Sequence, residues 1–338
     1  MFTKLFVPVL LVSSAVIPAF SLPAPLSPSR IFVRDNQGDN NSTQGNGNCS
    51  TSQNVVYLND TASRFPDLVY LAAGNQDFRS AVANSSNPNL LQDLTTNGQH
   101  PEYLFLGCSD SRVSEGTIFS APPGALFTQR NIGNQFQPVD NNAISVLSYG
   151  VQSLGVGHII VMGHYGCGGV AAAMLPRPNT TDDPSRSSVQ SWINPIRYTY
   201  LNSSRPEIVS FREANENKTS VDYPKFDDPG FRALVEENVK DSVFNILISP
   251  MMQQHWNAYI AQEQGQNGTT SSTRRSSDSS APLKPVYVHG FVYDISTGYV
   301  TDLKTSFGPY GAVSQAPPQD AVKRAVAADQ HAHGHVHL

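Results

Sequence analysis

The chain has 338 residues, of which 39% are hydrophobic and 14% charged, and its formal net charge at pH 7 is −5. This length is enough for one large α/β domain, or for two ordinary domains, with a sizeable core. The acidic balance argues against a nucleic-acid partner, because nucleic-acid binding usually requires a basic face.

The amino terminus has the pattern of a secretory signal. Lys4 precedes the apolar run Leu5–Phe20, and the small residues Ala19 and Ser21 stand where a signal peptidase could cut. The run is short and contains proline, so it predicts a signal peptide over residues 1–21 and not a membrane span. No later stretch of the sequence is long and apolar enough to cross a bilayer.

Residues 22–57 are rich in Asn, Gly, Ser and Gln, and we expect a glycosylated, disordered arm there. Behind a signal peptide, many acceptor patterns for N-glycosylation predict a secreted, extracellular glycoprotein. Nine asparagines are followed two places on by Ser or Thr: Asn40, Asn41, Asn48, Asn59, Asn84, Asn179, Asn202, Asn217 and Asn267.

The folded domain is expected to span residues 58–310. Apolar residues between Asp77 and Leu94 recur at helical spacing, and Pro88 predicts a break in that helix. The segment that follows contains Gln99 and His100 and leads into the first strand. An exposed loop histidine is the favoured interpretation of His100, with a proton shuttle as the alternative.

Two apolar runs, residues 103–107 and 158–163, have the length and composition of buried strands. Cys108 follows the first run, and His164 and Cys167 follow the second. In open α/β sheets, functional side chains gather at the carboxyl ends of the strands. Two cysteines and a histidine that leave one coordination position open are a set that holds catalytic zinc. The sequence therefore indicates a zinc site at this edge of the sheet.

A disulfide between Cys108 and Cys167 is the alternative interpretation, because secreted proteins tend to pair their cysteines. We favour the metal, because His164 and the motifs around it are what a zinc site requires. Cys49 is the third cysteine of the chain, and it is either free or bridged to another chain.

Three motifs together resemble those of a β-class carbonic anhydrase of a secreted, fungal-like kind. They are Cys-Ser-Asp-Ser-Arg at 108–112, Arg-Asn-Ile-Gly-Asn at 130–134 and His-Tyr-Gly-Cys-Gly-Gly at 164–169, and the resemblance covers about residues 76–303. It implies an α/β fold with a mostly parallel central sheet flanked by helices. It also implies reversible hydration of CO2 to bicarbonate and a proton by a zinc-bound hydroxide, with one zinc per subunit on Cys108, His164 and Cys167.

The resemblance assigns catalytic roles to Asp110 and Arg112. Two positions apart on one loop, the two side chains can form an ion pair that holds the carboxylate ionised. The carboxylate then orients the zinc-bound water, or it binds zinc itself when Arg112 releases it; both arrangements occur in the family. The alternative interpretation is a structural ion pair on the surface.

Four further residues are implied to bind substrate. Gln99 and the backbone N–H of Gly168 would hold bicarbonate oxygens, and Phe127 and Tyr149 would keep the CO2 side of the pocket apolar. The alternatives are a local loop amide for Gln99, a core side chain for Phe127 and a surface side chain for Tyr149. In the family the amino-terminal helices reach across a partner subunit, so a homodimer or higher homo-oligomer is expected.

The remaining segments alternate between strands and helices, as in a mostly parallel sheet. We expect a short buried strand at 125–130 and a helix from Asp140 to Gly155. Residues 175–229 are predicted to be irregular, helical only near 192–200, and partly a glycosylated surface insertion. Other predicted segments are helices from 228 to 247 and from 249 to 260, a loop over 262–282, strands at 286–292 and 299–303, and a disordered His-rich tail over 311–338.

Two other functions stay open at this point. A zinc hydrolase of the same fold acting on CS2 or COS would use the same ligands. A non-catalytic secreted zinc-binding glycoprotein would only sequester metal, but it would not need the pairing of Asp110 with Arg112.

Overall fold

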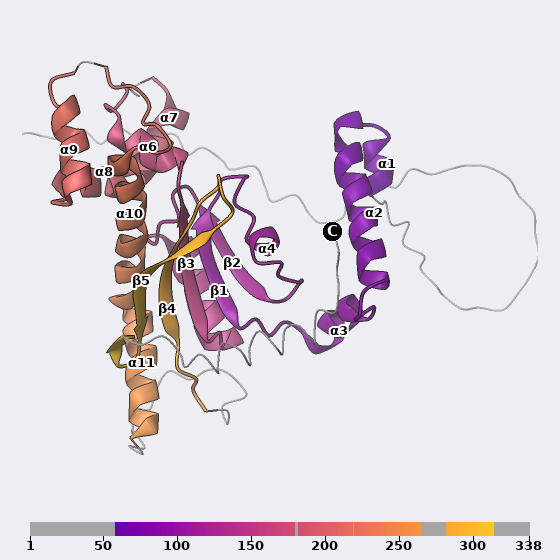
Figure 1. The fold of residues 1–338 in the computed structure, drawn as a ribbon. Coiled ribbons are helices and arrows are strands. Elements are labelled where there is room, and N and C mark those ends of the chain that lie inside the picture. The colour runs from indigo at the N-terminus through magenta and orange to yellow at the C-terminus, as the bar shows by residue number, and fades with distance from the viewer. Residues whose placement is uncertain (1–57, 180–181, 219, 265–281, 314–338) are drawn as a thin grey trace, which may run out of the picture.

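The computed structural model describes residues 58–179, 182–218, 220–264 and 282–313 (Figure 1). The predicted signal peptide, the arm with Cys49, most of the loop at 262–282 and nearly all of the His-rich tail lie outside these ranges. Among the described helices, none is long and apolar enough to span a membrane.

A six-stranded sheet in the order β2-β1-β3-β4-β5-β6 forms the centre of the molecule. The strands β2, β1, β3 and β4 run parallel, and β5 and β6 are antiparallel to their neighbours. This confirms the predicted α/β fold with a mostly parallel sheet. The strands are β1 (Tyr103–Cys108), β2 (Leu126–Asn131), β3 (His158–His164), β4 (Tyr287–Tyr293), β5 (Val300–Gly308) and β6 (Gly311–Ala312).

The two strands that carry the motifs lie side by side within the sheet. All residues of β1 after Tyr103, and all residues of β3 after His158, are buried, which explains why both sequences are apolar throughout. By contrast, β2 is half-buried along its length because it forms the edge of the sheet. The prediction of a buried strand there was therefore right about the strand and wrong about its burial.

Helices cover one face of the sheet with a continuous apolar core. The long helix α10 (Pro229–Leu247) runs along β3 and β4 and is capped by Asp228, whose side chain accepts a hydrogen bond from the N–H of Phe231 (Figure 1). Its prediction is confirmed. Other helices of the domain are α4 (Glu115–Ile118), α5 (Asn141–Ser148), a π-helical turn (Tyr149–Leu154), α6 (Gly168–Met174) and α11 (Pro250–Glu263).

Residues 175–229 are more helical than predicted. They form α7 (Pro184–Trp192), α8 (Asn194–Asn202) and α9 (Pro206–Asn215). Each of the three has proline in its first turn, where the missing N–H costs no hydrogen bond. Ile196 and Ile208 are buried in the main core, so part of this segment is integral to the domain.

The amino-terminal helices stand apart from the sheet (Figure 1). They are α1 (Leu58–Ala62), a 3-10 turn (Pro66–Leu68), α2 (Val69–Ala83) and α3 (Leu90–Asn97), and the predicted break near Pro88 falls between the last two. Tyr70 is 83% exposed and Phe65 is 60% exposed. These helices therefore present apolar side chains that the described part of the chain does not cover.

Candidate metal centre

The three predicted ligands meet at the carboxyl edge of the sheet. Cys108 is the last residue of β1, His164 is the last residue of β3, and Cys167 immediately precedes α6. Because β1 and β3 are parallel neighbours, their ends are brought to the same edge. Gly166, at a φ of +75°, makes the tight turn that returns Cys167 to His164.

The ligand atoms of Cys108, His164 and Cys167 are buried and lie within 4.8 Å of one another. The two sulfur atoms are 3.9 Å apart and both thiols are free. A disulfide requires a separation near ~2.05 Å, whereas two thiolates on a tetrahedral zinc at ~2.3 Å lie about 3.8 Å apart. The geometry therefore matches a metal site, and the disulfide alternative is not what the structure contains.

The histidine ring also has the orientation of a ligand. Nδ1 of His164 lies 3.1 Å from the carbonyl oxygen of Tyr165. Nε2 is buried and has no hydrogen-bond partner among the described residues. An unsatisfied buried nitrogen is costly unless something binds it. With the proton on Nδ1, the lone pair of Nε2 is directed to the position that a metal would occupy.

The two thiols titrate as a pair. The pKa of Cys108 is lowered to about 4, chiefly because the thiol of Cys167 donates a hydrogen bond to its sulfur. The same hydrogen bond, together with burial, raises the pKa of Cys167 well above its usual value. One thiolate is thus present without metal, and a cation would have to displace the second proton.

Asp110 and Arg112 form a three-point contact beside the ligands. Nε and Nη2 of Arg112 donate to the two carboxylate oxygens at 2.9 and 2.7 Å, and the backbone N–H of Arg112 donates to Oδ1 at 3.0 Å. These bonds hold the pKa of Asp110 at about 2. Its Oδ2 lies 3.7 Å from Nε2 of His164. The structure thus shows the paired arrangement, and the catalytic roles of the two residues stay predictions.

Arg130 holds the loop that carries Cys108 and Asp110 in place, a role that the sequence analysis did not predict. Its guanidinium donates to the carbonyl oxygens of Cys108 and Asp110 at 3.0 and 2.8 Å. Arg130 is the first residue of the motif at 130–134, and this position was the sequence signal that could have pointed to the role.

The sequence analysis did not identify Tyr223 as a residue near the metal centre. Its hydroxyl lies 3.9 Å from where a Cβ would stand on Gly168, the first residue of α6. Burial raises the pKa of this phenol, and the nearby Cys167 adds to the effect. A tyrosine on the loop before α10 therefore borders the metal centre, although no motif marks it.

The other predicted substrate residues lie away from the ligands within one chain. Phe127 is in register with Leu104, four residues before the level of Cys108, which is about 13 Å along the strand. Its ring lies 5.7 Å from that of Tyr149, which is 50% exposed. Gln99 precedes the start of β1. Of the four residues, only Gly168 is brought to the metal centre by this chain.

His100, next to Gln99, lies in the same segment. Its Nε2 is 3.0 Å from the carbonyl oxygen of Asn97, and its side chain is exposed. This agrees with the favoured interpretation of an exposed loop histidine.

Solved structures define the class of this fold. The Coccomyxa β-carbonic anhydrase in complex with acetazolamide is similar, with a TM-score of 0.52 and 29% sequence identity over 71% of this chain and 88% of that chain. A tetrameric β-carbonic anhydrase from the filamentous ascomycete Sordaria macrospora gives a TM-score of 0.51 and 25% identity over 71% and 98% of the two chains.

Sequence comparison leads to the same class. The family model described as carbonic anhydrase matches residues 103–262. A carbonic anhydrase from Emericella nidulans is 31% identical over 227 residues, which are 67% of this chain and 79% of the relative. A carbonic anhydrase from Candida albicans is 26% identical over 79% of this chain and 81% of the relative. The chain therefore belongs to the carbonic anhydrase family, in its β class, and is an enzyme of that class.

Proposed function

We propose that the chain is a zinc-dependent carbonic anhydrase that reversibly hydrates CO2 to bicarbonate and a proton. The observation that carries this proposal is the buried set of Cys108, His164 and Cys167, with the free Nε2 of the histidine facing the carboxylate of Asp110. A zinc ion held by such a set would supply a Lewis acid that lowers the pKa of water from 15.7 to about 7.

Asp110 is suited to orient the reacting water. With a pKa of about 2 the carboxylate is ionised at neutral pH, so it can accept a hydrogen bond from the water but cannot donate one. Arg112 donates two hydrogen bonds to Oδ1 but only one to Oδ2, so Oδ2, the oxygen that lies 3.7 Å from Nε2 of His164, keeps a lone pair for the water. The accepted hydrogen bond would turn a lone pair of the water away from the carboxylate and toward CO2.

We propose further that a second copy of the chain completes the pocket. Three of the implied substrate residues, Gln99, Phe127 and Tyr149, lie near the amino end of the parallel strands, too far from the ligands of their own chain. The exposed apolar side chains of α2, such as Tyr70, support an association that would bury them. A homodimer is the smallest assembly that could bring the two halves of the pocket together.

Stopped-flow measurement of CO2 hydration on the zinc-loaded protein tests the proposed function. We expect hydration that is lost when a chelator removes the metal and that returns on adding zinc. Hydrolysis of CS2 or COS without CO2 hydration would favour the same-fold hydrolase instead. Tight zinc binding with no turnover of either kind would favour the sequestering glycoprotein, which the ordered contact between Asp110 and Arg112 argues against.

We propose that the protein is secreted and glycosylated. Supporting this, the sequon asparagines Asn84, Asn179, Asn202 and Asn217 are all exposed, so glycans there would not disturb the core. Intact-mass measurement on protein from its native host decides the point. We expect loss of about residues 1–21 and sugar that an N-glycan-cleaving enzyme removes. A polypeptide that keeps those residues and carries no sugar would overturn this proposal.

A further inference from the structure

Tyr165 connects the candidate metal centre to the helical layer. It follows His164 directly, and its carbonyl oxygen is the acceptor for Nδ1 of that ligand at 3.1 Å. Its own N–H donates to the carbonyl oxygen of Tyr293 on β4 at 3.0 Å. The peptide groups on both sides of Tyr165 thus fix how the histidine ring is turned.

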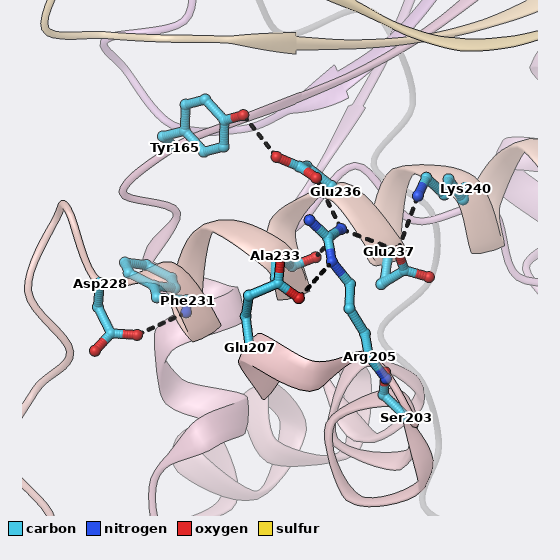
Figure 2. Close-up of polar contacts among 10 residues, drawn as sticks. All are labelled: Tyr165, Ser203, Arg205, Glu207, Asp228, Phe231, Ala233, Glu236, Glu237 and Lys240. Atoms are coloured by element: carbon cyan, nitrogen blue, oxygen red, sulfur yellow. Dashed lines mark hydrogen bonds and ion pairs between the residues drawn. The ribbon is translucent and has the colours of Figure 1, made fainter. Parts of the chain in front are cut away.

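The side chain of Tyr165 is held at both its hydroxyl and its ring. The hydroxyl donates to Oε1 of Glu236 on α10 at 2.8 Å, and Oε2 of Glu236 binds Nη1 of Arg205 at 2.7 Å (Figure 2). The guanidinium of Arg232 stacks on the ring, 3.4 Å from its centroid, and is itself 3.3 Å from Asp294. The phenol therefore has a polar anchor at one end and a cation on its face.

This anchoring matters because the loop from His164 to Cys167, here called the ligand loop, contains a glycine. Gly166 separates Tyr165 from Cys167 and adopts a positive φ of 75°, a conformation that glycine enters freely. Without an external anchor, the turn would have many conformations, and only some would place both ligands together. An anchor on Tyr165 restricts the turn before any metal arrives.

We propose that Tyr165 is a positioning residue, clamped by Glu236 and Arg232, that preorganises His164 and Cys167 for metal. This inference rests on the proposed zinc site. It links the ligand loop to Arg205, which precedes α9, so that a segment interpreted from the sequence as partly an insertion supports the metal centre. Groups that orient a metal-bound histidine typically contribute 10- to 100-fold in affinity.

The test is Tyr165→Phe, which removes the hydroxyl but keeps the backbone and the aromatic ring. We expect zinc affinity, measured by competition with a chromophoric chelator, to fall by about 10-fold. The difference in Tm between zinc-loaded and zinc-free protein should shrink accordingly. In the cobalt-substituted protein, the d–d absorption bands should shift, because they report the geometry of the ligands.

Tyr200→Phe is the matched control. Tyr200 is also a buried aromatic, but its hydroxyl has no hydrogen bond with another described residue in the structure, and we expect wild-type zinc affinity and cobalt spectrum. A second pair of variants tests the anchor itself. Glu236→Gln keeps an acceptor for the phenol and should retain more zinc affinity than Glu236→Leu, which keeps none.

Two outcomes would overturn the inference. One is wild-type zinc affinity in Tyr165→Phe. The other is an equal loss of Tm with and without zinc, which would make the tyrosine a structural residue only. If the wild-type protein itself fails to bind zinc, the proposed function fails instead, so the two failures are distinguishable.

Discussion

The two ends of the central sheet differ in how complete they are. At the carboxyl end, Cys108, His164 and Cys167 are buried and already within reach of one metal. Near the amino end, Phe127 and Tyr149 contact each other at the edge of the sheet, and Tyr149 is half-exposed. One chain therefore already brings together the three residues that could hold a metal, whereas the substrate pocket that we propose would need residues from a second copy of the chain.

The largest expected effect is a loss of zinc and of activity at the candidate metal centre, at the carboxyl end of the sheet. Cys108→Ser removes one of two thiolates, and we expect the variant to lose its zinc and to hydrate CO2 no faster than buffer. Elemental analysis and stopped-flow assays on the same sample check this. Cys49→Ser is the control, because it also removes a thiol but should keep zinc and activity. Retention of one zinc per chain by Cys108→Ser would disprove the ligand set.

The next effect separates the metal from its neighbouring carboxylate. Asp110→Asn keeps the shape of the side chain and leaves all three ligands in place, so zinc should stay at the wild-type level. Activity should fall by roughly 10²-fold or more, because a positioned proton acceptor typically contributes that much. Asp183→Asn, at the exposed cap of α7, is a control that should not change activity. Full activity in Asp110→Asn would remove this residue from the mechanism.

The smallest effect is on stability against acid. The pKa of Asp110 is about 2 in the folded protein, below the ~3.9 of an unfolded chain, so the unfolded state binds more protons between these values. Its contribution, about 2 kcal/mol, is fully present above pH ~4 and is lost as pH falls through about 2. In zinc-free protein, urea unfolding should show wild type more stable than Asp110→Asn near pH ~5, with the gap closing near pH ~2. A gap that does not depend on pH would contradict the ion pair as its cause.

Much of the candidate metal centre at the carboxyl end of the sheet could be predicted from the sequence. The runs before Cys108 and His164 are apolar because β1 and β3 are buried between neighbouring strands, and parallel strands bring their ends together. The ligands therefore followed from local patterns. The contact between Tyr165 and Glu236 did not, because 71 residues separate them and only the packing of α10 on the sheet brings them together.

Two helices, α7 and α9, were also not predicted, although each carries a sequence signal, whereas the helix predicted near 192–200 corresponds to α8. Pro184, Pro195 and Pro206 each lie in the first turn of one of the three helices, a position that proline favours. The pocket is a different case. Residues such as Phe127 are implied by family resemblance alone, and no pattern within one sequence indicates whether they line the pocket of their own chain or that of a second copy.

Mixing two defective variants tests whether each substrate pocket is built from two copies of the chain. One variant is Asp110→Asn, and the other combines Phe127→Ala with Tyr149→Ala; each should be nearly inactive alone. If each pocket draws its apolar residues from the partner, a hybrid dimer contains one fully wild-type site. After unfolding and refolding an equal mixture, random pairing should then restore about a quarter of wild-type activity. If the mixture is only as active as the mean of the two variants, no site is shared between chains, and a second copy does not complete the pocket.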